Sequence, residues 1–308
     1  MFRSHRRAPS FRARALLAAA TTLAVAAVAV AHESEWGALN AELVGQHGIK
    51  ERSLAYQTET GILSNLADGV VTPASEAITI DMAPGVTGRM YWGRGNLVNT
   101  VTMDPKAQIP RETSPGERIM IMLEGSLEQW IDGVWVPMER TAIEPTFYFA
   151  TGVVGRQDAL YLEAGAQSAV RAGADGAQFI EFYCPVRLDY LQKAGVTVPD
   201  DVGPPALNGT PNMMPNQVFD LQQIQYTMLV PGAWTRILNG RGMQISNIFM
   251  EPDIEFGYHN HPEEQLMIVQ RGGIREFILD GQHDMDTGDM LFLPAMLIHG
   301  GKLSPEAC

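Results

Sequence analysis

Residues 257–272 read Gly-Tyr-His-Asn-His-Pro-Glu-Glu-Gln-Leu-Met-Ile-Val-Gln-Arg-Gly, and residues 288–299 read Gly-Asp-Met-Leu-Phe-Leu-Pro-Ala-Met-Leu-Ile-His. His259 and His261 are two residues apart, so on a β-strand both imidazoles point to the same face. Gln265 has the same parity, and the apolar Met267 and Val269 follow it on that face. Such a face can hold a metal ion inside a barrel. The alternative is a polar histidine pair on an edge strand.

The histidines are concentrated at the C-terminal end of the chain. The sequence has seven, and four of them lie in the last 50 residues, namely His259, His261, His283 and His299. His283 follows the turn pair Asp280-Gly281, so we expect it to be an exposed turn residue rather than a ligand. His32 and His47 lack any supporting pattern for a second metal site.

The chain contains an internal repeat with an offset of 147 residues. The segment 84–125 aligns without a gap on 231–272, with 13 identities in 42 positions. These include Gly93-Arg94-Gly95 on Gly240-Arg241-Gly242, and Glu117 on Glu264. Several others are prolines and glycines, whose backbone roles are hard to replace. Gene duplication therefore accounts for the pattern.

Both copies are predicted to be β-structure. Short segments rich in Val, Ile, Phe and Met are separated by Gly, Pro or Asp-Gly, which is typical of antiparallel strands. Asp132-Gly133 and Asp280-Gly281 are predicted hairpin turns at matching positions. The fold class is therefore all-β, with each copy an antiparallel sheet folded into a barrel or a sandwich. The predicted strands include 96–103, 118–123, 178–184, 246–250, 265–269 and 273–279.

The two quoted stretches resemble the two motifs of the cupin family. The first motif has Gly, then H-x-H, then Glu or Gln, then Gly, and the second has Gly, Pro, Gly and His. The resemblance implies two jelly-roll barrels and a metal site whose ligands are His259, His261, Gln265 and His299. Two positions depart from the family pattern. Gln265 stands in place of the usual acid, and Met296 stands in place of the second motif's Gly.

Glu264 is the competing candidate for the third ligand. Its parity directs it away from the two histidines unless Pro262 introduces a bulge, and bulges do occur at such sites. Gln265 is therefore the predicted ligand, and Glu264 the alternative.

The metal motifs match only in the second copy. At the corresponding positions of the first copy stand Glu112, Ser114, Arg118 and Ser168. A cationic Arg among the would-be ligands opposes metal binding, so the first barrel is expected to be structural, a dimerisation surface or a degenerate pocket.

Three imidazoles and an amide would leave the charge of a divalent ion uncompensated. Such an ion suits Lewis-acid chemistry on an anionic oxygen ligand. The donor set is compatible with one Fe, Mn, Ni, Co, Cu or Zn ion per chain.

Residues 1–31 are predicted to be a signal peptide. A basic start precedes the uncharged run Ala15–Val30, and Ala29-Val30-Ala31 is a small-x-small cleavage site. A membrane anchor is the rival interpretation, but the run falls short of the roughly 20 strongly apolar residues of a spanning helix. The expected location is the periplasm or the cell exterior.

The remaining chain is strongly acidic. Cleavage removes five of the 22 basic residues and no acid, leaving 17 basic against 35 acidic side chains and a formal charge of −18. Nucleic acid and anionic membrane are therefore unsuitable partners, since both require basic patches. The expected partner is a small, anionic ligand, with a homodimer through the barrel faces as a further option.

The predicted organisation has five parts. A signal peptide (1–31) precedes an N-terminal arm (32–80), a degenerate barrel (81–191), a Pro/Gly-rich linker (192–226) and a metal-binding barrel (227–308). Only nine residues follow His299, too few for the closing strand. Either another segment completes the second barrel or the chain is truncated.

Three functions fit these features. The H-x-H-P-x-E-Q form of the first motif resembles that of small cupins from pectin and alginate pathways, which linearise unsaturated uronates. This resemblance implies isomerase or lyase chemistry on a carboxylated sugar or hydroxy acid. A dioxygenase of the quercetinase type is the second enzyme hypothesis. A non-catalytic ligand- or metal-binding protein is the third. The acids Glu251, Glu255, Glu263, Glu264 and Glu276 cannot be placed relative to the metal from sequence.

Overall fold

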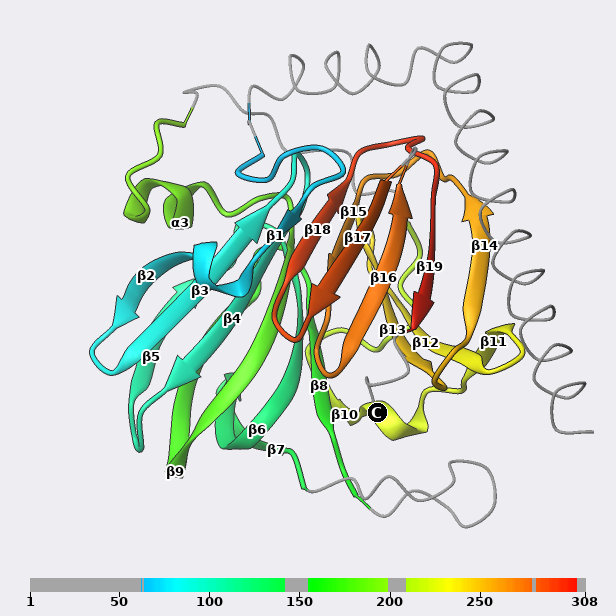
Figure 1. The fold of residues 1–308 in the computed structure, drawn as a ribbon. Helices are drawn as coiled ribbons and strands as arrows, with labels where there is room; N and C mark the ends of the chain where they lie inside the picture. The colour runs from blue at the N-terminus through cyan, green and yellow to red at the C-terminus, as the bar shows by residue number, and fades with distance from the viewer. Residues whose placement is uncertain (1–61, 63, 142–154, 199–208, 279–280, 304–308) are drawn as a thin grey trace, which may run out of the picture.

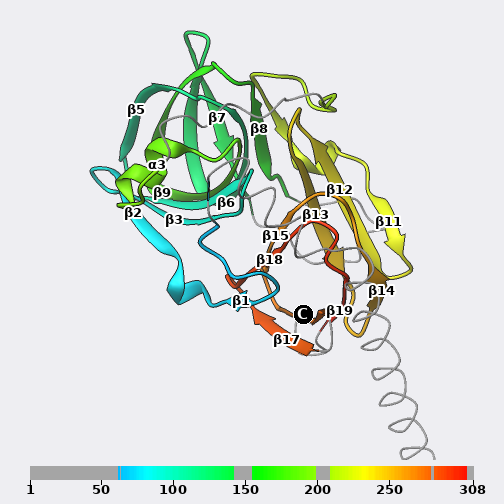
Figure 2. The same cartoon turned by 90° about the horizontal axis from the view of Figure 1, so that it is seen from above.

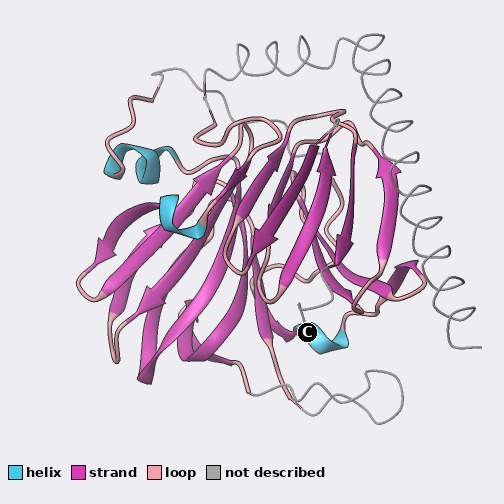
Figure 3. Cartoon of the chain, in the orientation of Figure 1, coloured by secondary structure: helices cyan, strands magenta, loops and turns pink. Residues whose placement is uncertain are grey.

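The computed structural model of the protein describes residues 62, 64–141, 155–198, 209–278 and 281–303. Strands dominate this part of the chain (Figure 3), and its one α-helix is α3 (Leu188–Lys193). Two short 3-10 turns, η1 (Ala74–Glu76) and η2 (Leu221–Gln223), complete the helical content of the described residues. The predicted all-β fold is confirmed. The predicted signal peptide lies outside the described residues.

Within the described residues, no helix has both the length and the apolar character needed to cross a membrane.

The first copy forms a barrel built on its two longest strands, β6 (Glu117–Ile131) and β9 (Gln167–Cys184), which pair antiparallel. Asp132 and Gly133 have positive φ at the end of β6, as expected for a hairpin turn into β7. The other strands of this barrel are β2 (Ile78–Ala83), β3 (Val86–Trp92), β4 (Leu97–Met103), β5 (Gln108–Thr113), β7 (Val134–Glu139) and β8 (Asp158–Leu162).

The second copy wraps around its own centre beside the first (Figures 1 and 2). Its strands form a three-stranded sheet β11-β12-β13, a four-stranded sheet β14-β19-β16-β17, and the pair β15-β18. Their bounds are β11 (Thr227–Val230), β12 (Ala233–Asn239), β13 (Gln244–Met250), β14 (Glu255–His259), β15 (Gln265–Ile268), β16 (Gly273–Ile278), β17 (Gly281–Asp286), β18 (Met290–Leu293) and β19 (His299–Leu303).

The two barrels share the same strand register at the positions of the predicted metal ligands. In the second barrel His259 pairs with His299, and Gln265 pairs with Leu293. In the first barrel the corresponding pairs are Glu112 with Ser168 and Arg118 with Leu162. The duplication inferred from sequence therefore preserved the backbone arrangement while the side chains diverged.

An apolar core lies between the barrels. Along β6, Met120 and Met122 face the interior of the first barrel, whereas Ile119 and Ile121 face the second barrel. There they join Met290 and Phe292 of β18, and Leu266 and Ile268 of β15 pack against the same cluster. This explains why both β6 and β18 carry uninterrupted apolar runs instead of alternating ones, because each strand is covered on both faces.

Each barrel is completed by a strand from outside its own repeat. The short β1 (Val71–Thr72), which precedes the first barrel in sequence, pairs with β18 of the second. Likewise β10 (Gln217–Asp220), from the segment predicted to be a linker, pairs with β8 of the first barrel. Because β8 and β18 are equivalent strands, the exchange is nearly symmetric. The second barrel is thus extended by residues that precede the first.

A pair of reciprocal contacts also joins the barrels. Glu264 accepts hydrogen bonds from the backbone N–H groups of Arg94, Gly95 and Asn96, at 2.8–3.1 Å. Its repeat equivalent Glu117 accepts from Arg241 and Gly242, both at 2.7 Å. Each carboxylate thus fills the anion-binding turn formed by the Gly-Arg-Gly segment of the other barrel. We call these two contacts the carboxylate clasps.

The clasps predict a stability effect that is separate from metal binding. Glu264→Ala and Glu117→Ala should each lower the free energy of unfolding of the metal-free protein by about 2–4 kcal/mol, because each leaves several N–H groups without their charged acceptor. Urea denaturation measures the loss. The matched control is Glu263→Ala, an exposed neighbour of Glu264, which should change the unfolding free energy by less than about 0.5 kcal/mol. Equal values for Glu263→Ala and Glu264→Ala would show that the clasp contributes nothing.

Candidate metal centre

Three histidines converge at one end of the second barrel. His259 ends β14 and His299 begins β19, directly opposite each other in the antiparallel pair. His261 follows β14, and its carbonyl accepts a hydrogen bond from the Met296 N–H at 2.7 Å. This hydrogen bond joins residues 257–272, which hold the first motif, to the loop of residues 288–299, which hold the second. The three ligand nitrogens lie within 4.8 Å of one another, a spacing at which they could hold one metal ion.

Backbone carbonyls orient all three rings. Nδ1 of His259 lies 3.1 Å from the carbonyl of Gly257, Nδ1 of His261 lies 2.9 Å from that of Glu263, and Nδ1 of His299 lies 2.9 Å from that of Leu297. A carbonyl only accepts, so Nδ1 carries the hydrogen in His259 and His299, and each Nε2 is left with a lone pair, as metal-ligating histidines require. In His261 both ring nitrogens face oxygens, the Glu263 carbonyl at Nδ1 and Gln265 Oε1 at Nε2.

These carbonyls are parts of the site that sequence reasoning missed. Each lies two residues from its histidine along the chain. The signal was therefore local in sequence, but the Gly257 carbonyl lies within the register shift between Phe256 and His259 of the β14–β19 pair, which the sequence did not predict.

Gln265 lies next to the triad. Its Oε1 is 2.8 Å from Nε2 of His261. Two adjacent ligands of one ion, each bonded at about 2.1 Å, stand roughly 3 Å apart in a right-angled geometry. The spacing is therefore compatible with Gln265 and His261 binding the same ion.

Glu264 points elsewhere, as the parity argument predicted. Its carboxylate is occupied by the clasp with Arg94, Gly95 and Asn96 of the first barrel. No bulge redirects it toward the histidines.

The three histidines differ in burial. His299 is buried, His261 is half-buried and His259 is exposed. Burial lowers the pKa of His299 to about 4, so this imidazole is neutral at physiological pH and available as a ligand. The exposed side of His259 is the side from which a small molecule can approach.

The backbone conformation at Met296 shows why the second cupin motif has Gly at this position. This residue has φ of +66°, in the left-handed region where glycine is favoured, and its counterpart Gly165 in the first barrel has φ of +84°. The turn therefore requires the glycine conformation, and Met296 adopts it at a steric cost.

Comparison with known proteins supports the cupin resemblance. The AraC-like ligand binding domain family matches residues 248–308, which include all four candidate ligands. AerE from Microcystis aeruginosa superposes with a TM-score of 0.52 at 14% identity, covering 74% of this chain and 91% of that chain. The fold is cupin-type.

Oxalate decarboxylases show the same cupin-type architecture. The formate complex of the Lactobacillus farciminis enzyme matches with a TM-score of 0.54 at 12% identity, covering 79% of this chain and 84% of that one. The Bacillus subtilis enzyme, studied for its Mn(II) centres, matches with a TM-score of 0.54 at 15% identity, covering 79% and 76%. At these identities the likeness shows the fold alone. A search of curated proteins found no matching sequence.

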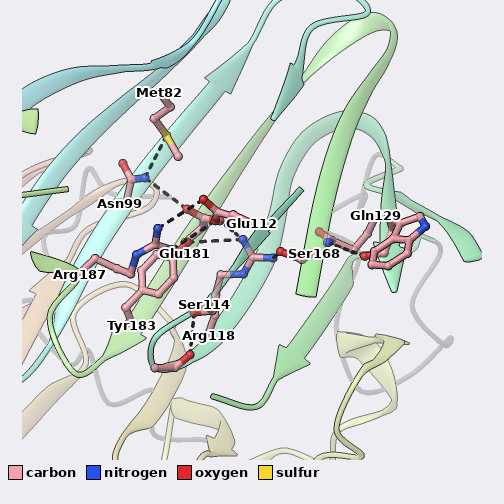
Figure 4. Close-up of polar contacts among 12 residues, drawn as sticks. Met82, Asn99, Glu112, Ser114, Arg118, Gln129, Ser168, Glu181, Tyr183 and Arg187 are labelled. Carbon is pink, nitrogen blue, oxygen red and sulfur yellow. Dashed lines mark hydrogen bonds and ion pairs between the residues drawn. The ribbon is translucent and has the colours of Figure 1, made fainter. Parts of the chain in front are cut away.

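The first cupin-type barrel holds an ion pair where the second holds histidines (Figure 4). Arg118, at the position of Gln265, donates to Glu181 and to Ser168, both at 3.0 Å. Arg118 and Glu181 are both buried, and Ser168 is the counterpart of His299. Burial lowers the pKa of Arg118, but the nearby Tyr183 and Glu181 outweigh this effect and raise the pKa above its ordinary value overall. A permanent cation therefore occupies this interior.

Substitutions at adjacent positions distinguish ligand from clasp. We expect wild-type protein to bind one equivalent of transition metal per chain, and Gln265→Ala to lower metal affinity by at least about 10-fold, as loss of a ligand should. Glu264→Ala should retain wild-type affinity in the folded protein, despite its lower stability. Metal titration followed by elemental analysis measures both. Two tightly bound equivalents, or a loss confined to Glu264→Ala, would contradict the assignment.

Proposed function

We propose that the second barrel binds one divalent transition metal through His259, His261, His299 and Gln265. We further propose that this centre binds a small carboxylate- or enol-bearing ligand, most plausibly an acidic sugar, and promotes an isomerase- or lyase-type rearrangement without oxygen. When bound, the metal would supply Lewis-acid polarisation of a ligand oxygen. The convergence of three imidazoles and one amide oxygen is the observation that carries the proposal.

The charge of this donor set favours an anionic ligand. Every candidate ligand atom belongs to an uncharged group, so a divalent ion keeps its full positive charge at the site. The chain as a whole is acidic, but exposed charges further away than a Debye length of about 8 Å are screened at physiological ionic strength. The local charge therefore dominates once a ligand has entered.

The residues around the histidines support the same chemistry. Met267 and Val269 pack against the apolar cluster of Ile278, Leu291, Leu293 and Leu297. These side chains exclude water from the interior side of the site, and a dry surrounding strengthens electrostatic interactions with a ligand. Because His259 is exposed, a ligand can reach the site from that side.

A substrate screen with and without oxygen tests the proposal. Metal-loaded protein is incubated with unsaturated uronates, hydroxy acids and flavonols, and both ligand conversion and oxygen consumption are followed. We expect conversion of a uronate or hydroxy acid at equal rates under air and under argon. His299→Ala should abolish conversion, whereas Ser168→Ala, at the corresponding position of the first barrel, should retain it.

The alternative functions give different results in the same screen. If flavonols cause oxygen consumption and no compound is converted without oxygen, the protein is a dioxygenase and the proposal is wrong. Tight binding without conversion of any compound would indicate a binding protein.

We also propose that the protein acts in the periplasm or outside the cell. The support is the signal-like sequence of residues 1–31. Intact-mass measurement of protein exported by a bacterial host should give a chain starting at or near His32. Retention of residues 1–31 in the exported protein would contradict this.

A further inference from the structure

Glu276 lies inside the second barrel, on the same face of its sheet as His299. In the pairing of β16 with β19, Ile278 stands opposite His299 and Glu276 stands opposite Gly301. Directly opposed residues share a face of the sheet, and so do residues two apart on one strand. Glu276 therefore occupies the row of side chains next to the histidine row. The two rows are about 7 Å apart along the strand.

The space above Gly301 is shaped for this carboxyl group. A Cβ atom at position 301 would collide with Oε1 of Glu276 and with the ring of Phe256. The Phe256 ring in turn packs edge-on against His259, with ring centroids 5.9 Å apart. The carboxyl group and His259 thus lie on either side of the same aromatic ring. The close approach of these groups leaves no room for a side chain at position 301.

The Glu276 carboxyl group is buried and lacks a partner. Its side chain has no exposed surface, and neither oxygen has a hydrogen-bond partner among the described residues. Its neighbours along β16, Ile274 and Ile278, belong to the apolar interior. Burial raises the pKa of Glu276 to about 9, so at neutral pH the group holds a proton that it can donate.

The surrounding charged groups do not neutralise Glu276. Arg275, the adjacent residue on β16, is directed outward and pairs with Asp284 at 2.6 Å. His283 stands opposite Glu276 on β17, but its Nε2 lies over Gly281. An unpaired buried carboxyl group destabilises the fold, so its presence calls for a partner other than the described residues.

Resting on the function proposed above, we infer that Glu276 recognises the ligand: its protonated carboxyl donates a hydrogen bond to an oxygen of the molecule bound at the histidines. The carboxyl group lies one side-chain row away from the histidines. Acetate has oxygens only on the carboxylate that the histidine site would hold, whereas a sugar acid has oxygens along its whole length. Glu276 therefore selects extended, polyhydroxylated acids over small ones.

The first barrel provides a matched control. Gln129 is the repeat equivalent of Glu276 and is also buried, with an unpartnered Oε1. It pairs with Val170, the counterpart of Gly301, so the first barrel has a side chain at the position where the second barrel has none. Gln129→Met should therefore leave ligand binding unchanged.

The test compares Glu276→Met with Glu276→Gln in Mn²⁺-loaded protein. D-Galacturonate and acetate serve as the extended and the short probe, and calorimetry gives their dissociation constants. Glu276→Met, of similar length but apolar, should weaken galacturonate binding by about 10- to 100-fold, as loss of a strong hydrogen bond predicts. Acetate and Mn²⁺ affinities should stay within about 3-fold, since a difference that small is close to the error of separate titrations. Glu276→Gln keeps a donor and should retain most galacturonate affinity.

Thermal unfolding provides a second readout. Glu276→Met removes an unpaired polar group from an apolar interior, so its melting temperature should rise above that of the wild type. A purely structural role for Glu276 would lower it. Should Glu276→Met fail to fold, Glu276→Leu takes its place in both measurements.

The outcomes separate this inference from the proposed function. If wild-type protein binds galacturonate and Glu276→Met binds it equally well, the inference is overturned and the proposed function stands. Loss of Mn²⁺ from Glu276→Met would place Glu276 in the metal centre and also overturn the inference. If wild-type protein binds Mn²⁺ but neither probe, the proposed function fails and the inference fails with it.

Discussion

The antiparallel pairing of β14 with β19 is the constraint on which the candidate metal centre depends. It sets His259 opposite His299, and the bulge beside that pair directs the carbonyl of Gly257 to the His259 ring. The centre is therefore a consequence of strand register more than of any single contact. A slip of one residue would turn one histidine to the other face of the sheet and dismantle the site.

The first barrel has the same strand register but different side chains at the equivalent interior positions. Arg118 and Glu181 form a buried ion pair there, and Ser168 completes the group where His299 stands in the second copy. A buried pair of this kind adds little net stability, because desolvation of both charges offsets their attraction. It does, however, fill a polar interior without a metal. One duplicated scaffold has thus been kept with two chemically distinct centres.

The barrels depend on each other physically. Strands β1 and β10 are exchanged between the copies, and an apolar core joins β6 to β18 and β15. The carboxylate clasps add a polar link, and one of them uses Glu264, the neighbour of Gln265. The first barrel therefore supports the strand that presents Gln265. The first barrel, which has no histidine at these positions, therefore packs against the barrel that holds the histidine triad.

The sequence by itself determined the all-β class, the duplication and the shared face of His259 and His261, because strand periodicity and internal similarity can be read directly from the chain. His299 was added to them by the resemblance of residues 288–299 to the second cupin motif. The sequence also placed Glu264 and Gln265 on opposite faces of one strand, since alternation follows from backbone geometry. Only the tertiary structure decided what Glu264 binds, which segments complete each barrel, and that Glu276 lies buried beside the histidines. Those facts depend on contacts between residues far apart in sequence, and no local pattern encodes the strand register that brings them together.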